Sequence, residues 1–224
     1  WLKKFRFGQW IAGFHSSKSS IINDQWRGME MFLDQKLEYQ NPKLEWVYSS
    51  FRENMKDIVG FGKNAGAQVI IANAASNIRD SAPFSSIGTG VGISANETFN
   101  HARSLEASGK LAEARKYYLQ ALDLDALRFR ADSKLNSITR SVGESGGKNV
   151  MFFDAQAELD ALSKVGSSGS DYFFEHVHLT FEGNYQLALL FGDRISKSLE
   201  SNGVASSGSW LSLSGCSRQL AYTN

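Results

Sequence analysis

The residues with the clearest capacity for chemistry are a carboxylate and a histidine three positions apart, Glu175 and His178. They lie in the stretch Asp171-Tyr-Phe-Phe-Glu-His-Val-His-Leu-Thr-Phe-Glu-Gly183, after which an apolar helical pattern begins. In a loop just ahead of a helix, a carboxylate at this spacing can turn back and accept the Nδ1 proton of the imidazole. That contact leaves Nε2 free as a general base. The spacing therefore predicts the base and the orienting acid of a hydrolytic site.

A second histidine, His176, allows two other uses of this stretch. On an extended segment, His176 and His178 would face one side with Glu175 beside them, which is one way to bind zinc. Two histidines alone rarely hold a catalytic metal, and His15 and His101 have no ligand-like neighbours in sequence. We therefore expect no metal ion at this pair. Taken alone, a histidine beside a carboxylate is more often a structural hydrogen-bonded pair than a catalytic one.

The residues around the pair favour the catalytic reading. The block His178-x-Thr180-x-x-Gly183, followed by an apolar helix, resembles the last motif of the SGNH (GDSL-type) serine hydrolases, which is Asp-x-x-His before a glycine-containing helix start. The chain is most similar to a bacterial subgroup that carries tetratricopeptide-like helices within the hydrolase domain. Four further stretches share this resemblance: Trp26-Arg-Gly-Met-Glu-Met-Phe-Leu33, Phe51-Arg-Glu-Asn-Met-Lys-Asp-Ile58, Asn77-Ile-Arg-Asp-Ser-Ala-Pro-Phe84 and Leu127-Arg-Phe-Arg-Ala-Asp132.

The resemblance implies a role for each member of the pair. His178 would be the catalytic base and Glu175 the acid that orients it. Glu175 is one methylene longer than the usual aspartate, which moves the carboxylate by about 1.5 Å unless the loop adjusts. Glutamate does serve this role in some other Ser-His-Asp/Glu hydrolases.

The same family takes its nucleophilic serine, its oxyanion-hole glycine and its oxyanion-hole asparagine from blocks that precede the segment beginning at Trp26. None of these blocks is present, and the chain opens at Trp1 without an initiator Met. We therefore expect the C-terminal part of a longer protein, which supplies only the base and the acid. An upstream signal peptide or anchor would then make the protein extracytoplasmic or membrane-anchored.

Composition excludes several other classes. The chain has 224 residues, of which 42% are hydrophobic and 12% aromatic, enough for one core with a small helical insert. The 24 basic and 23 acidic residues leave a net charge of +1 without a basic stripe, so we expect no nucleic-acid partner. Cys216 is the single cysteine and cannot form an internal disulfide. No run of about 18 apolar residues occurs, so we expect no membrane segment in this chain.

Hydrophobic periodicity predicts the elements that position the pair. Apolar residues recur at spacings of three and four over residues 44–66, which predicts an amphipathic helix. Residues 67–72 and 149–153 read as short buried strands, and the helix-turn-strand order predicts that they run parallel. A last helix is expected over residues 182–201.

Residues 95–124 change character to a helical hairpin. The small and aromatic positions of one tetratricopeptide unit are matched by Ala102, Leu105, Gly109, Ala114, Tyr118 and Ala121, with Gly109 at the turn. A lone repeat cannot bury both of its faces, so we expect the hairpin to pack on the rest of the chain.

Together with the resemblance, these elements predict an α/β fold. We expect a partial three-layer α/β/α domain of the SGNH-hydrolase (flavodoxin-like) type, with parallel strands and a tetratricopeptide-like helical insertion. The expected boundaries are a loosely ordered segment at 1–25, the α/β domain at 26–94 and 143–202, the insert at 95–142, and a disordered Ser/Gly-rich tail at 203–224.

A polar loop follows the first predicted strand. Asn73, Asn77, Arg79 and Asp80 lie at its carboxyl end, where parallel sheets place ligand sites, and this favours a substrate-lining role. The alternative is that Arg79 and Asp80 simply pair with each other. The run Gly88-x-Gly90-x-Gly92 lacks the strand and the charged residue of a phosphate loop and reads as a flexible linker.

The sequence thus leads to two hypotheses from different classes. The first is an SGNH-like serine ester hydrolase, an esterase or deacetylase that acts on a small-molecule or glycan acyl ester. The second is a binding or scaffold protein with a degenerate hydrolase fold, which contacts a protein partner through the tetratricopeptide-like insert. A serine block upstream of Trp1 would favour the first hypothesis.

Overall fold

The computed structural model describes residue 32 and residues 34–87, 94–204 and 208–222. The chain divides into two units, Trp1–Gln35 and Lys36–Asn224, and the helices and strands described below belong to the second. The predicted loosely ordered segment 1–25 and the glycine run of residues 88–92 lie outside the described residues. Within the described part of the chain, no helix is long and apolar enough to cross a membrane.

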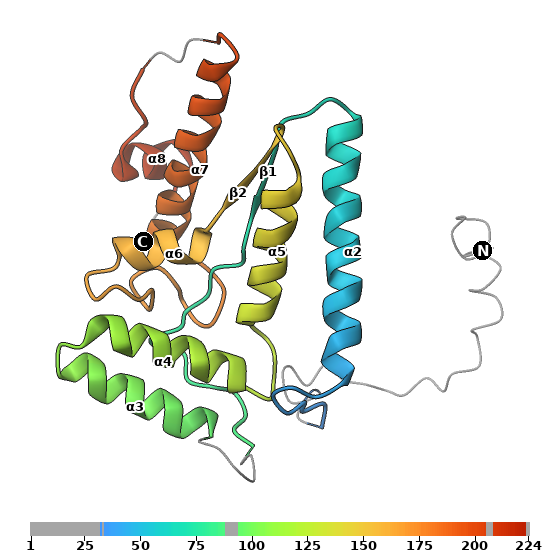
Figure 1. Ribbon diagram of the computed structural model, residues 1–224. Coiled ribbons are helices and arrows are strands. Elements are labelled where there is room, and N and C mark those ends of the chain that lie inside the picture. The colour runs from blue at the N-terminus through green and yellow to red at the C-terminus, as the bar shows by residue number, and fades with distance from the viewer. Residues whose placement is uncertain (1–31, 33, 88–93, 205–207, 223–224) are drawn as a thin grey trace, which may run out of the picture. The chain divides into compact units, whose positions relative to one another are not determined.

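The second unit is mostly helical and contains a small parallel sheet, so the fold is mixed α/β (Figure 1). The element order is α2 (Lys43–Asn64), β1 (Val69–Ala72), α3 (Ala95–Ala107), α4 (Leu111–Leu124), α5 (Ser133–Ser145), β2 (Val150–Phe153), α6 (Ala155–Leu162), α7 (Phe181–Ser201) and α8 (Leu213–Gln219). The predicted long first helix, both strands and the last long helix are confirmed, with ends that shift by only a few residues.

The sheet consists of β1 and β2 in parallel, as the helix-turn-strand order predicts. Val69 pairs with Val150, and the register continues to Ala72 opposite Phe153. The chain leaves both strands at the same edge, where Asn73 and Asp154 follow them. Asn73 Nδ2 donates to Asp154 Oδ1 at 2.7 Å, so the two strand ends are also joined by side chains.

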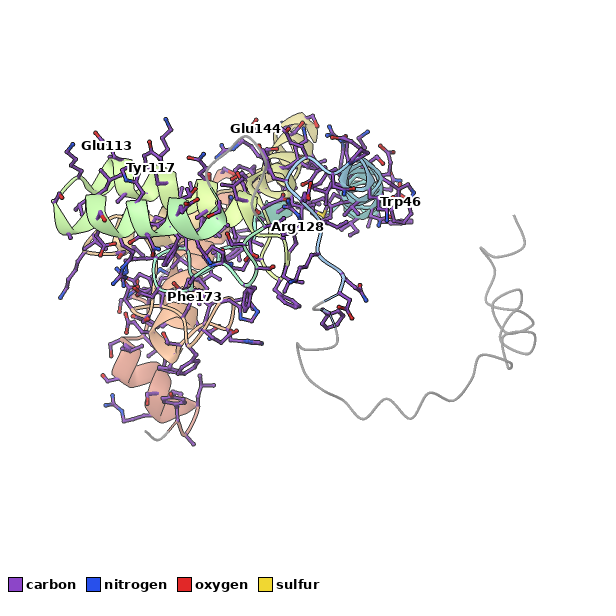
Figure 2. The ribbon with its side chains drawn as sticks, turned by 90° about the horizontal axis from the view of Figure 1, so that it is seen from below. Trp46, Glu113, Tyr117, Arg128, Glu144 and Phe173 are labelled. Atoms are coloured by element: carbon purple, nitrogen blue, oxygen red, sulfur yellow. The ribbon has the colours of Figure 1, made fainter. Side chains whose placement is uncertain are left out.

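The hairpin of α3 and α4 forms where it is predicted, and Gly109 at its turn has a φ of +75°. Ser94 and Glu97 form a capping box that fixes the start of α3. Figure 2 shows Glu113 and Tyr117 on this hairpin, apart from Trp46 on α2. Ile78, from the loop after β1, packs against the inner face of the hairpin. The hairpin residues in this cluster are Ala102, Leu105, Ala114, Tyr118 and Leu122. The lone repeat therefore buries its face against the rest of the unit, as expected.

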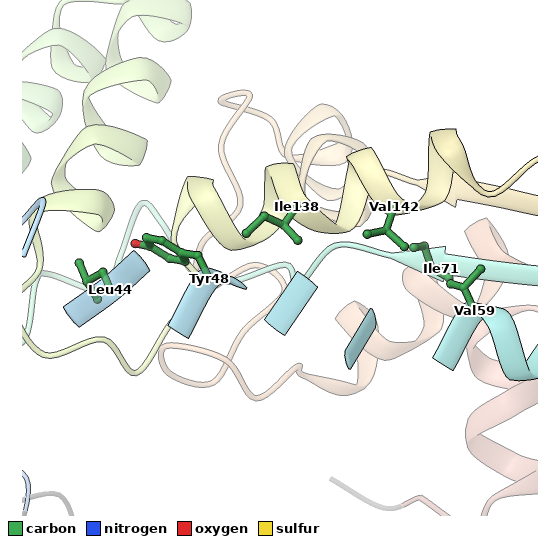
Figure 3. Packing of buried hydrophobic residues seen from close by; sticks show 6 residues of the cluster. All are labelled: Leu44, Tyr48, Val59, Ile71, Ile138 and Val142. Carbon is green, nitrogen blue, oxygen red and sulfur yellow. The ribbon is translucent and has the colours of Figure 1, made fainter. Parts of the chain in front are cut away.

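Helix α5 belongs with the sheet and not with the insert. Its residues Ile138 and Val142 share a core with Ile71 of β1 (Figure 3), and α2 contributes Leu44, Tyr48 and Val59 to the same core. In the structure the hairpin ends with α4, and α5, which the expected insert of residues 95–142 largely includes, returns the chain to β2. Its apolar stripe needs a partner, and the sheet supplies one.

The structure also differs from the prediction of a disordered tail at residues 203–224. The described residues 208–222 include the short helix α8, and several contacts join them to α7. Tyr185 donates its hydroxyl hydrogen to the Leu211 carbonyl at 2.9 Å, and the rings of Phe181 and Tyr222 stack at 4.3 Å. The tail shows no apolar period because single aromatic residues, and not a helical stripe, make these contacts.

Close packing of α5 on the sheet depends on Gly143. A Cβ atom at this position would lie 2.8 Å from Cβ of Phe152 and 3.2 Å from the Ile71 side chain. We predict that Gly143→Ala lowers the free energy of unfolding by about 1–2 kcal/mol, because overpacking outweighs the better helix propensity of alanine. Chemical denaturation followed by circular dichroism measures this.

Gly60→Ala is the matched control, because Gly60 also lies inside a helix and a Cβ there meets nothing within 4 Å. This variant should be up to about 1 kcal/mol more stable than the wild type. Equal effects of the two substitutions would contradict the packing of α5 described above.

Candidate functional site

Glu175 and His178 lie in a short closed loop directly ahead of α7. Phe173 and Leu179 form an antiparallel bridge across its base. The Phe174 amide donates to the His178 carbonyl at 2.8 Å, and the Thr180 amide donates to the Tyr172 carbonyl at 2.9 Å. The loop is therefore held at its base by backbone hydrogen bonds on both sides of the bridge.

Helix α7 begins where this loop ends. Thr180 is its N-cap, and the side-chain oxygen accepts the Gly183 amide at 3.0 Å. A Cβ atom on Gly183 would collide with the Tyr172 carbonyl oxygen. The Thr-x-x-Gly part of the motif thus has a physical cause, because the cap fixes the helix start and the glycine lets the loop approach it.

The predicted contact between the two site residues is present. Glu175 Oε1 lies 2.6 Å from His178 Nδ1. The same oxygen accepts the backbone amides of Val177 at 3.1 Å and of His178. Because the carboxylate occupies Nδ1, the neutral imidazole carries its proton there and presents Nε2 as the acceptor. The His178 side chain is 78% exposed, so this nitrogen is accessible.

The electrostatic surroundings keep Glu175 ionised. Desolvation raises the pKa of its carboxyl, but the amides of His178 and Val177, the His178 ring and the nearby His176 together lower the pKa to about 2. A carboxylate that stays charged can stabilise an imidazolium as it forms.

His176 is the second partner of Glu175, and its environment is different. Its Nδ1 contacts Glu175 Oε2, and its ring packs edge-on against Phe84, with centroids 5.0 Å apart, and against Phe129. Desolvation lowers the pKa of His176, the positive charge of Arg130 lowers it further, and Glu175 opposes both. With only 16% of its side chain exposed, His176 serves as a wall and a second anchor for the carboxylate.

Asn77 holds the loop from the other side. Its backbone amide donates to the His176 carbonyl at 3.0 Å, and its side-chain amide donates to the Glu175 carbonyl at 3.0 Å. Its side-chain oxygen accepts the amide of Asp80 at 2.8 Å. Of the polar residues predicted to line a site after β1, Asn77 is thus brought directly to the Glu175 loop. The other three have different partners.

Arg79 and Asp80 pair with each other, at 2.9 Å, which is the structural alternative left open by the sequence. Arg79 also contacts Asp171 at 3.3 Å, and Asp80 accepts the Ser170 amide at 2.8 Å. These bonds tie the loop after β1 to the segment that leads into the Glu175 loop. Asn73 instead faces Asp154 across the strand ends.

A buried ion pair lies behind this arrangement and was not identified in the sequence. Arg130 and Asp125, whose side chains are 2% and 3% exposed, approach to 3.3 Å. Arg130 donates to the carbonyls of Asn77, at 2.9 Å, and of Ser81, at 2.8 Å. The signal was one aspartate and two arginines alternating with apolar residues in Asp-Ala-Leu-Arg-Phe-Arg130. Sequence alone does not distinguish this buried pair from the exposed pairs that are more common.

Asp125 completes the connection to the loop after β1. Its carboxylate accepts the amides of Phe84, at 2.9 Å, and of Ser85, at 3.0 Å. Phe84 is the residue whose ring packs on His176. The pair therefore supports both Asn77 and Phe84, the two residues that hold the histidine loop.

No group of three or more histidine, cysteine, aspartate or glutamate residues that could hold a metal occurs in residues 34–87, 94–204 and 208–222. The zinc arrangement considered for His176 and His178 is replaced by two bonds to one carboxylate, since each Nδ1 faces Glu175. Cys216 is a free cysteine in α8.

Comparisons with known proteins do not assign the chain to a family. No family model matches the chain, and neither the curated proteins nor the solved structures include a significant match.

The low pKa of Glu175 gives a prediction for acid titration. Because the folded pKa of about 2 is below the ordinary value of 4.5, ionised Glu175 stabilises the folded state fully above pH 4.5. This contribution is lost as pH falls toward 2. In a carboxyl ¹³C NMR titration, we expect the Glu175 resonance to have its midpoint near pH 2.

His178→Ala is the informative variant for this titration. It removes the ring donor and leaves the backbone amides, so the Glu175 midpoint should rise but stay below 4.5. A wild-type midpoint at the ordinary value would contradict the hydrogen bonding described for this carboxylate.

The buried ion pair gives a prediction for stability. Arg130→Met removes one partner and leaves Asp125 charged in the interior, so the free energy of unfolding should fall by about 3–5 kcal/mol. Urea denaturation measures the loss. Arg140→Met is the control, because Arg140 is half-exposed where it pairs with Asp154 and its removal should cost within about 1 kcal/mol. Similar losses from both variants would show that the Asp125–Arg130 pair has no special role.

Proposed function

We propose that this chain is part of an SGNH-like serine ester hydrolase, an esterase or deacetylase, in which His178 is the general base and Glu175 orients it. The observation that carries the proposal is the 2.6 Å contact between Glu175 Oε1 and His178 Nδ1, in a loop that leaves the imidazole exposed. This is the geometry expected of a base with its orienting acid. The resemblance of the surrounding motif to the SGNH hydrolases selects the reaction class.

The chemistry follows from the free ring nitrogen. His178 Nε2 takes the proton of a serine hydroxyl as the serine oxygen attacks the ester carbonyl, and Glu175 stabilises the imidazolium. The imidazolium then gives its proton to the leaving alcohol as the acyl C–O bond breaks. Water, activated by the same histidine, hydrolyses the acyl-enzyme. The proposal requires no metal or organic cofactor.

The longer side chain of Glu175 is compatible with the role usually taken by aspartate. The extra methylene lets the carboxylate turn back over the loop, where Oε1 bonds the ring of His178 and also the backbone amides of Val177 and His178. The hydrogen bonds from the loop thereby place a flexible side chain in one position. This supports Glu175 as the orienting acid.

The nucleophile would come from a segment outside the described residues. Within the described part of the chain, the His178 ring hydrogen-bonds only Glu175. In the proposed enzyme, the serine approaches the exposed Nε2 from another part of the intact protein.

The arrangement of helices around the sheet supports the finer fold assignment, a partial three-layer α/β/α domain. Successive side chains of a strand point to opposite faces of the sheet. Phe152 of β2 packs toward α5, where Gly143 makes room for it, whereas Phe153 contacts Phe191 of α7 at 4.6 Å. Figure 1 shows α2 and α5 on one side of the strands and α7 on the other.

Ester hydrolysis by site variants tests the proposal. In the intact protein, His178→Ala should lower kcat for p-nitrophenyl acetate by roughly 10⁴-fold or more, and Glu175→Gln by about 10⁴-fold, because each breaks the base and its orienter. His101→Ala is the matched control, because His101 is an exposed histidine that packs on Tyr117 of the hairpin, and its activity should equal that of the wild type.

The 224-residue chain alone should turn over this ester no faster than its own His178→Ala variant. Activity of the intact His178→Ala protein within threefold of the wild type would refute the role of His178.

A further inference from the structure

A pocket of about 410 Å³ lies between the start of α7 and helix α8. Residues from three segments line it: Phe174, Thr180, Phe181, Glu182, Leu213, Ser214, Ser217 and Tyr222. Its volume is in the range of small-ligand sites. The pocket exists because the C-terminal segment folds back onto α7, where Tyr222 stacks on Phe181.

Phe174 connects this pocket to His178. The Phe173–Leu179 bridge makes Phe174 and His178 the next opposed pair of the small hairpin, and the Phe174 amide donates to the His178 carbonyl at 2.8 Å. Opposed residues of an antiparallel pair point to the same face. Phe173 points inward and is buried, whereas Phe174 is 70% exposed beside the exposed His178. The wall of the pocket is therefore the cross-strand neighbour of the proposed base.

The polar groups of the pocket already have partners within the protein. The Thr180 hydroxyl oxygen accepts the Gly183 amide, and Glu182 accepts the Gln186 side-chain amide at 2.6 Å. The Ser217 hydroxyl donates to the Tyr222 carbonyl at 3.0 Å, and Ser214 contacts Ser212 at 3.1 Å. What remains for a ligand is mainly the surface of Phe174, Phe181, Leu213 and Tyr222. An apolar group fits this surface better than a polyhydroxylated one.

The role of His178 in the proposed reaction determines whether the alcohol or the acyl end of the ester lies beside it. In the proposed reaction, the imidazolium passes its proton to the oxygen of the leaving alcohol as the acyl C–O bond breaks. The alcohol must therefore lie beside His178, whereas the acyl group stays on the serine. A pocket whose wall adjoins His178 on the same face of the hairpin is placed for the alcohol.

We infer that the pocket between α7 and α8 binds the apolar alcohol portion of the ester substrate, with Phe174 as the wall shared with the catalytic base. This inference rests on the proposed function, because it assigns the leaving group to the side of His178. It names the substrate class as esters of alkyl or aryl alcohols and makes the C-terminal helix α8 part of the site.

A series of acetate esters tests the assignment in the intact protein. From ethyl to butyl to hexyl acetate, kcat/KM should rise by about fourfold for each added methylene that enters the pocket. The leaving alcohols have similar acidity, so the rise reports binding. Ser217→Phe fills the pocket and should remove the rise, and Phe174→Ala, at an exposed position that tolerates truncation, should weaken it.

Two controls isolate the alcohol side. The ratio of kcat/KM for ethyl butanoate and ethyl acetate varies the acyl group and should be the same in Ser217→Phe as in the wild type. Trp46→Ala truncates an exposed aromatic residue on α2, apart from Phe173 of the histidine loop in Figure 2, and should leave both series unchanged. A change confined to the acyl series in Ser217→Phe would overturn the assignment to the alcohol.

Binding of hexan-1-ol, the free alcohol, gives a readout that does not need turnover. In amide NMR spectra of the 224-residue chain, hexan-1-ol should shift the resonances of Phe181, Leu213 and Ser217, and Ser217→Phe should abolish these shifts. Absence of the shifts in the wild type overturns the pocket even if the protein is an esterase. His178-dependent hydrolysis with unchanged alcohol selectivity in both pocket variants overturns the pocket alone. Hydrolysis that is independent of His178 overturns the proposed function, and the assignment of the pocket to a leaving group fails with it.

Discussion

The buried ion pair of Asp125 and Arg130 is the interaction on which the candidate site depends. Removing both charges from water is costly, and the cost is offset only where the remaining hydrogen-bonding groups are also used. Most of the hydrogen-bonding groups of this pair are used. Arg130 donates to two carbonyls of the loop after β1, and Asp125 accepts two amides of the same loop. The pair thus gives a fixed conformation to residues 73–87, which form no helix or strand of their own.

The fixed loop in turn positions the residues that could do chemistry. Asn77 bonds the backbone of Glu175 and His176, and Phe84 packs on the His176 ring, so the carboxylate has defined supports on both sides. His178 remains at the surface, with one ring nitrogen committed to Glu175. A general base needs this combination, because rigid supports set the tautomer while exposure leaves the other nitrogen to a substrate or nucleophile.

The sequence was sufficient for the elements with strong periodic signals and for the motif with local spacing. Helix α2, both strands, the α3–α4 hairpin and the Glu175–His178 contact were predicted, since each depends on neighbours within a few residues or on one apolar stripe. The role of Asp125 and Arg130 depends on contacts with residues some 40 to 50 positions away, which no local pattern encodes. Helix α5 was assigned to the insert because an apolar stripe in the sequence does not identify the surface against which the helix packs. The C-terminal helix was missed because isolated aromatic residues, such as Tyr222, hold it to α7.

The orientation of His178 by Glu175 determines which ring nitrogen carries the proton, and this tautomer can be measured. Long-range ¹H–¹⁵N correlation spectra of the imidazole at neutral pH distinguish a protonated Nδ1 from a protonated Nε2. The hydrogen bond from Nδ1 to Glu175 predicts that the neutral ring carries its proton on Nδ1, with Nε2 unprotonated, and that Glu175→Gln disturbs this preference. A neutral ring protonated on Nε2 in the wild type would mean that Glu175 does not orient His178, and the site would then lack the free base on which the account rests.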